Sequence, residues 1–139
     1  MMLDLTNAPQ ETVIKFVKDW LKLLSEDQLE EACSLLDPVP KVYGDRVWTP
    51  SLIRELIADT FPPTSRFYRF HPEGPVFTDP YELEPQANRE KVGEFNNDGG
   101  YWFNCDMPFN HEWSDLTAQF EFHKTPTGYE AILVDFHVM

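Results

Sequence analysis

The sequence predicts a single α+β domain over residues 1–139, in which N-terminal helices pack on a curved, mainly antiparallel sheet. Apolar residues recur at helical spacing in the first part of the chain, and after residue 66 the period changes to two. The chain then ends in a strand pair with a turn between its arms. Helices followed by a strand meander must cover one face of the sheet. With 42% apolar residues, a chain of this length fills one core without a metal or a disulfide.

Three helices are expected before residue 62. The first begins at Asn7 as a cap, with Pro9 in its first turn, and carries an apolar stripe made of Val13, Phe16, Val17, Trp20, Leu23 and Leu24. The pattern Ser25-Glu26-Asp27-Gln28 predicts a capping box for a second helix that ends at Asp37-Pro38. Thr49-Pro50-Ser51 opens the third, which stops before Pro62-Pro63. The short connectors require sharp turns between helices.

Short strands are expected in the middle of the chain. Arg66 to Phe70 is a strand candidate, and the four prolines of residues 71–90 predict a long loop with at most an edge strand near Val76 to Thr78. A hairpin then joins Lys91–Asn96 to Tyr101–Met107 around Asn97-Asp98-Gly99-Gly100, because Asp-Gly and Gly-Gly accept positive φ.

The terminal hairpin carries the clearest alternation. Leu116 to Lys124 alternates apolar and polar residues, a turn follows at 125–128, and Tyr129 to Met139 runs back. If Lys124 faces Tyr129 and no bulge intervenes, Ala118 faces Asp135 and Leu116 faces His137. The competing alternation turns Ile132, Val134, Phe136 and Val138 inward and leaves the two polar residues in solvent. Both alternatives remain open from the sequence.

The candidate catalytic residues are Asp135 and His137, with Tyr101 as a hydrogen-bond donor. Residues two positions apart lie on the same side of a strand, so the carboxylate and the imidazole would face one cavity together. Burial or pairing there would tune either group as a general base. A structural ion pair is the competing interpretation.

The candidate binding residues are aromatic and acidic. Trp102 and Trp113 lie near Asp106, Glu112 and Asp115 in the stretch before the terminal hairpin. Aromatic side chains supply anchoring energy in protein interfaces, and acids steer a basic partner. Alternation assigns a second aromatic and apolar set to the core instead: Tyr101, Phe103, Cys105 and Met107.

Charge and missing motifs exclude several function classes. The net charge of −13 disfavours nucleic-acid and anionic-membrane partners and permits a basic protein or a cationic ligand. No metal-binding spacing, phosphate loop, nucleophile elbow or dinucleotide fingerprint is present, so we expect no metal and no cofactor. Cys33 and Cys105 fit a reduced, cytoplasmic protein with buried thiols, since no leader sequence precedes the first helix.

This order of elements resembles the nuclear transport factor 2-like superfamily, a cystatin-like cone that includes ketosteroid isomerases, small polyketide cyclases and many non-enzymatic proteins. The resemblance runs from the helical pair at Val13–Leu36 to the closing hairpins and is one of element order. It implies a bent sheet around a pocket and frequent dimers. No catalytic residue is carried over, and the proline-rich segment from His71 to Gln86 departs from the compact members.

Three functional hypotheses follow. The first is a non-enzymatic interaction domain for a basic protein, with a toxin-neutralising immunity protein as one form that the resemblance implies. The alternative is a pocket enzyme, an isomerase, cyclase or lyase, that acts on a small apolar ligand with Asp135 or His137 as base. The third is a homodimer whose sheet faces pack together.

Overall fold

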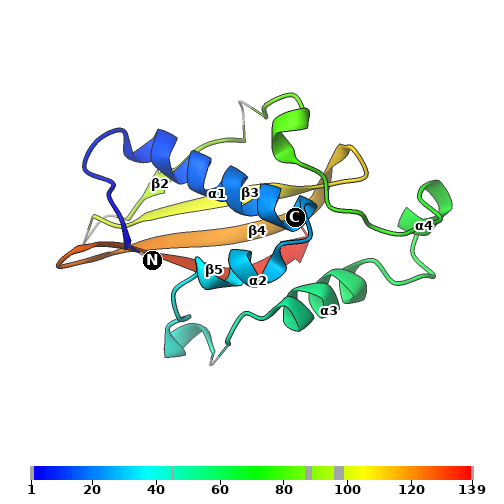
Figure 1. Cartoon of the computed structure of the whole chain (residues 1–139), viewed down its shortest axis with the longest axis horizontal. Helices are drawn as coiled ribbons and strands as arrows, with labels where there is room; N and C mark the ends of the chain where they lie inside the picture. The colour runs from blue at the N-terminus through cyan, green and yellow to red at the C-terminus, as the bar shows by residue number, and fades with distance from the viewer. Residues whose placement is uncertain (1, 45, 87–88, 96–98, 139) are drawn as a thin grey trace.

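A computed structural model describes residues 2–44, 46–86, 89–95 and 99–138, and these form an α+β fold (Figure 1). The helices are α1 (Pro9–Ser25), α2 (Leu29–Ser34), α3 (Pro50–Thr60) and α4 (Phe67–Phe70), with 3-10 turns η1 (Lys41–Tyr43) and η2 (Pro80–Glu82). The strands are β1 (Met2–Leu3), β2 (Gly93–Glu94), β3 (Tyr101–Phe109), β4 (Glu112–Thr125) and β5 (Gly128–Val138). They form one antiparallel sheet in the order β1-β5-β4-β3-β2. The predicted fold class is confirmed.

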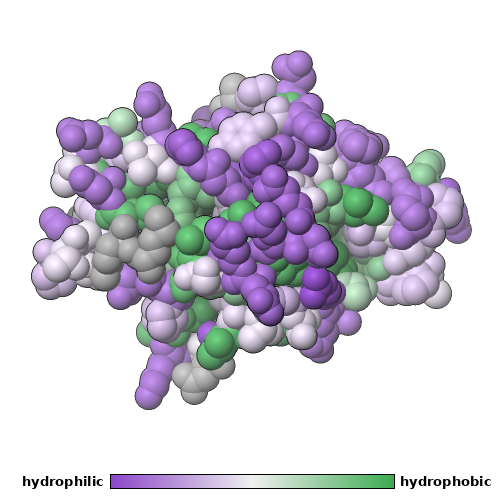
Figure 2. All heavy atoms as spheres, in the orientation of Figure 1, coloured by the Kyte–Doolittle hydropathy of each residue, from purple (hydrophilic) through white to green (hydrophobic). Residues whose placement is uncertain are grey.

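α1 and α2 lie across one face of the sheet, whereas α3 lies beside the β5 edge and α4 lies beyond the end of the strands (Figure 1). Figure 2 shows mainly hydrophilic residues over the middle of this face, and the buried side chains of α1 form its apolar stripe. Within the described ranges, no helix is long and apolar enough to cross a membrane.

The core is a cluster of aromatic rings between α1 and the sheet. Phe120 is only 1% exposed, and its ring centroid lies 5.4 Å from that of Trp20 and 6.5 Å from that of Phe16. Phe136 extends the cluster to Trp48, whose indole N–H donates to the Leu133 carbonyl at 2.7 Å. Aromatic side chains therefore fill the space where the cone resemblance implies a pocket.

The register of the terminal hairpin combines both predicted alternations. Lys124 faces Tyr129 and Phe120 faces Leu133, as the bulge-free pairing predicts. Val134 is then left without an opposite residue, and Gln119 faces Asp135. The bulge-free pairing is wrong beyond this point, because one extra residue in β5 reverses which side chains face the helices.

Two helix starts differ from expectation. Asn7 is not the cap of α1, because Ala8 takes that position in the left-handed region with φ 44°. The predicted capping box is also wrong, since the Ser25 hydroxyl donates to the Lys22 carbonyl at 2.6 Å and α2 starts only at Leu29. The cap of α3 is confirmed, because the Thr49 hydroxyl oxygen accepts from the Leu52 N–H.

The strand predicted at Arg66–Phe70 is wrong, because these residues form the short helix α4. Phe67 contacts Phe61 with ring centroids 4.6 Å apart and His71 with centroids 4.7 Å apart. The contact with His71 joins positions four residues apart, which a helical turn brings together and a strand would not. The edge pairing near Val76 is confirmed as one bridge between Phe77 and Phe109.

The hairpin between β2 and β3 is confirmed in a shorter form, with Gly93 opposite Trp102 and the Phe95 N–H donating to the Gly100 carbonyl. The predicted turn residues Asn97 and Asp98 lie outside the described residues.

Cys105 is buried, as predicted, and burial raises the pKa of its thiol to about 12. Cys33 is half-buried, and both cysteines are free thiols.

We expect Phe120→Ala to lower the free energy of unfolding by about 3 to 5 kcal/mol, because it removes a ring from the centre of the cluster. The same substitution at Phe70, which is 72% exposed, should change it by less than about 0.5 kcal/mol. Urea unfolding followed by circular dichroism measures both. Equal losses for the two variants would contradict the core described above.

Candidate functional site

A groove lies at the end of the molecule where α4 and the turn between β3 and β4 are found. We call it the hairpin groove; its volume is about 940 Å³. Its walls come from the end of α3, from α4 and from the first residues of β4. The residues that line it are Phe61, Ser65, Arg66, Phe67, Phe70, His71, Phe109, Glu112, Trp113, Ser114 and Asp115.

The floor of the hairpin groove is a ladder of aromatic rings. Phe61 lies between Phe67 and Phe109, with ring centroids 4.6 and 5.6 Å apart. Phe109 in turn contacts Phe77 at 5.3 Å. Phe70, at the outer end of α4, is 72% exposed although it is fully apolar. The groove therefore offers an apolar surface that water covers at a free-energy cost.

Acids form part of the rim. The side chain of Glu112 is 73% exposed, and Asp115 is also exposed. The His71 ring nitrogen Nε2 lies 4.0 Å from a Glu112 carboxylate oxygen. Arg66, at the start of α4, also lines the groove. The Trp113 indole N–H donates to the Glu84 carbonyl at 2.9 Å, which fixes the ring against the proline-rich segment. Three of the predicted binding residues, Glu112, Trp113 and Asp115, are thus brought together.

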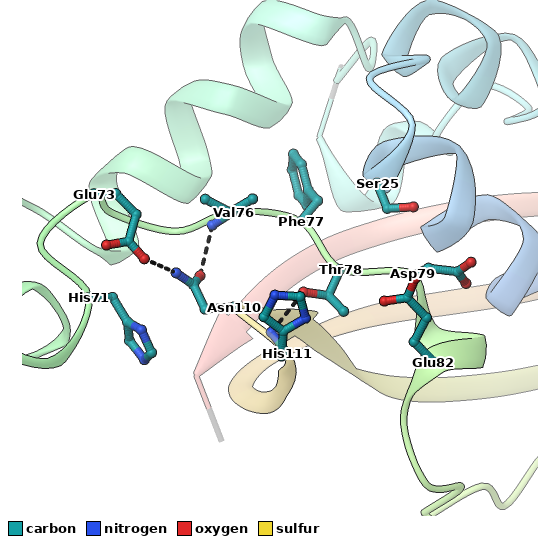
Figure 3. Close-up of a pocket in the computed structure, with 10 residues that line it drawn as sticks. All are labelled: Ser25, His71, Glu73, Val76, Phe77, Thr78, Asp79, Glu82, Asn110 and His111. Atoms are coloured by element: carbon teal, nitrogen blue, oxygen red, sulfur yellow. Dashed lines mark hydrogen bonds between the residues drawn. The ribbon is translucent and has the colours of Figure 1, made fainter.

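A second hollow of about 370 Å³ adjoins the groove and shares His71 with it (Figure 3). Asn110 holds its wall in place: the amide oxygen accepts from the Val76 N–H at 2.8 Å, and the amide nitrogen donates to Glu73 and to the Gly74 carbonyl at 3.0 Å. On the other side, the Thr78 hydroxyl oxygen accepts from the His111 N–H at 2.9 Å. These bonds attach residues 73–78 to the tip of the hairpin.

The tip itself has an unusual backbone. Asn110 and His111 are the only residues between β3 and β4, and their φ angles are 53° and 67°. A two-residue hairpin turn with positive φ at both positions normally takes Asn or Asp first and Gly second. His111 occupies the glycine position and pays a steric cost there, and it lines the hollow (Figure 3).

An ion pair anchors the proline-rich segment to α1. The Lys22 ammonium donates to the Asp79 carboxylate at 2.8 Å, and the Asp79 side chain also accepts from the Tyr81 N–H. Burial acts to raise the pKa of Asp79, but these two hydrogen bonds and the lysine charge outweigh it and lower the pKa. The same carboxylate raises the pKa of Lys22. Asp79 is therefore charged at neutral pH and holds η2 in place.

The three predicted catalytic residues are not brought together. Asp135 pairs with Arg46 at 2.8 Å and His137 lies opposite Thr117, both on the sheet face that the helices leave open. Tyr101 lies towards the other end of the sheet, opposite Phe122. The cavity on which the catalytic interpretation depends is filled by the aromatic core, and the catalytic role stays a prediction.

The remaining predicted binding residues lie away from the hairpin groove. Asp106 is only 6% exposed. Its carboxylate accepts from the Thr117 hydroxyl at 3.1 Å and pairs with Arg89 at 3.2 Å. Trp102 is exposed but lies on the open sheet face near β2. Among the described residues, no group of three or more His, Cys, Asp or Glu side chains is placed to hold a metal ion.

Sequence reasoning missed Phe61, Phe67 and Phe70 as groove residues. Glu112, Trp113 and Asp115 are also predicted to lie before the terminal hairpin, whereas β4 already begins at Glu112. The tight turn at residues 110–111 was also missed, although Asn110 is a residue type that accepts positive φ and could have indicated it.

Comparison with protein-family models, curated proteins and solved structures finds no match to this chain.

We expect His111→Gly to raise the free energy of unfolding by up to about 1 kcal/mol, because glycine adopts positive φ without a Cβ clash. His111→Ala is the control, since it removes the imidazole and keeps the strained Cβ. Chemical unfolding of both variants gives the comparison. If His111→Ala raises the free energy of unfolding as much as His111→Gly does, the imidazole and not the backbone angle causes the destabilisation.

Proposed function

We propose that this protein is a non-enzymatic binding domain whose hairpin groove takes an apolar segment of a basic protein partner. The observation that carries the proposal is the position of exposed Phe70 and the aromatic floor beside exposed Glu112 and Asp115. Aromatic anchors supply most of the binding energy at protein interfaces, and flanking acids select a partner with nearby Lys or Arg.

The exposure of the groove residues favours a peptide segment that binds from outside. Phe70 and Glu112 are both more than two-thirds exposed, so a partner can contact floor and rim without opening the domain. The net charge of −13 attracts a basic partner over long range and accelerates association at low salt. A basic toxin is one partner with this chemistry, in keeping with the superfamily resemblance.

Selection from a random peptide display library on the immobilised protein tests the proposal. We expect enriched peptides to combine Leu, Phe or Trp with Lys or Arg. For a selected peptide, the double variant Glu112→Lys and Asp115→Lys should weaken binding at least about tenfold, which corresponds to about 1.4 kcal/mol. Calorimetry or fluorescence polarisation measures the affinity, and raising the salt should weaken it as well.

The matched control is Glu30→Lys with Glu31→Lys, which makes the same charge change on the exposed surface of α2. It should retain most of the affinity, and Phe70→Ala should lose most of it. Failure to enrich any basic apolar peptide would contradict the proposal. If both charge reversals weaken peptide binding equally, the effect comes from the net charge and not from the acids of the hairpin groove.

A further inference from the structure

The sheet face opposite α1 carries a small trough that is separate from the hairpin groove. Its volume is about 240 Å³. It lies across β3, β4 and the bulge of β5, and the residues that line it include Phe95, Trp102, Asn104, Gln119, Glu121 and Val134. We call it the open-face trough. It shares no lining residue with the hairpin groove.

Trp102 forms an aromatic wall of the trough, and Gly93 positions it. A Cβ added at Gly93 would overlap the indole ring, so the ring packs directly on the glycine backbone of the neighbouring strand. Even so, the residue is 39% exposed. An indole held on one side by its own sheet and left accessible on another is a ready surface for a ligand ring.

Two amide side chains stand next to each other beside Trp102. Asn104 and Gln119 are directly opposite across β3 and β4, and both are half-buried. Within the described residues, neither side-chain amide has a hydrogen-bond partner, although together they offer donors and acceptors. Half-buried amides with open hydrogen-bonding capacity suit a ligand that carries both donors and acceptors.

The carboxylate of Glu121 is the third polar group, and its position is fixed. One of its oxygens accepts from the Tyr43 hydroxyl at 2.8 Å and lies 2.7 Å from His123 Nε2. The hydrogen bond to Glu121 raises the pKa of Tyr43, which keeps that hydroxyl a donor. The bulge at Val134 completes the trough, and bulges occur often where a strand shapes a binding site.

We propose that the open-face trough binds a neutral sugar ring. The C–H face of the ring would pack on Trp102, and its hydroxyls would exchange hydrogen bonds with Asn104 and Gln119 and donate to Glu121. The volume lies below the roughly 300–1,000 Å³ typical of drug-sized pockets and suits one ring. The carboxylate and the net charge of −13 disfavour phosphorylated and other anionic ligands.

Titration of the whole 15N-labelled chain with neutral sugars tests this site. The panel is glucose, galactose, mannose, N-acetylglucosamine, cellobiose and maltose, each up to about 100 mM to cover millimolar affinities. We expect at least one sugar to shift the Trp102 indole N–H and the side-chain amide signals of Asn104 and Gln119 along a saturable curve. Signals of Trp113 in the hairpin groove should stay in place.

Gln119→Ala should weaken that sugar at least about fivefold, since it leaves a sugar hydroxyl without its partner. Gln10→Ala, the same change on the exposed surface of α1, should leave the affinity unchanged. Trp102→Phe tests the ring contact independently and should also weaken binding. Circular dichroism confirms that each variant is folded.

The proposal is overturned if none of the sugars gives a saturable shift at the trough, or if Gln119→Ala and Trp102→Phe both bind like the unmodified protein. Trough signals that move with protein concentration in the absence of sugar would also overturn it, because a second copy of the chain would then cover this face. None of these results depends on whether the hairpin groove binds peptides.

Discussion

The contact between Trp20 of α1 and Phe120 of β4 is the interaction on which the rest of the structure depends. It places α1 across the centre of the sheet and joins Phe16 on one side to Phe136 and Trp48 on the other. These rings occupy the space between α1 and the sheet, in the close packing typical of protein interiors. The hollows described above lie instead at the hairpin end and on the open sheet face.

The bulge at Val134 changes which side chains of β5 face the helices. Before it, Leu133 faces the helices; after it, Phe136 does, and Asp135 turns to the open face, where Arg46 pairs with it. One inserted residue thus preserves the aromatic core along the whole strand and moves a carboxylate away from that core. The same bulge lines the open-face trough. One irregularity in β5 thus affects both the packing of the core and the shape of the open face.

The proline-rich segment is an ordered wall because other elements hold it. Asn110 bonds to residues 73–76, Thr78 bonds to the hairpin tip, and Lys22 holds Asp79. Because these polar groups are hydrogen-bonded, the long connection is held in place although it has little regular secondary structure. The positive φ of His111 is the backbone cost of the tight turn that makes these contacts.

The sequence by itself determined the α+β class, the inward stripe of α1, the cap at Thr49 and the pairing of Lys124 with Tyr129, because periodicity, capping and turn chemistry act between near neighbours. It also marked Glu112, Trp113 and Asp115 as one cluster, since they are adjacent in the chain. Tertiary structure alone decided the helix at Phe67, the burial of Asp106 and the bulge at Val134. Each depends on a partner distant in sequence or on the fit of one strand to another, and no local pattern encodes that fit.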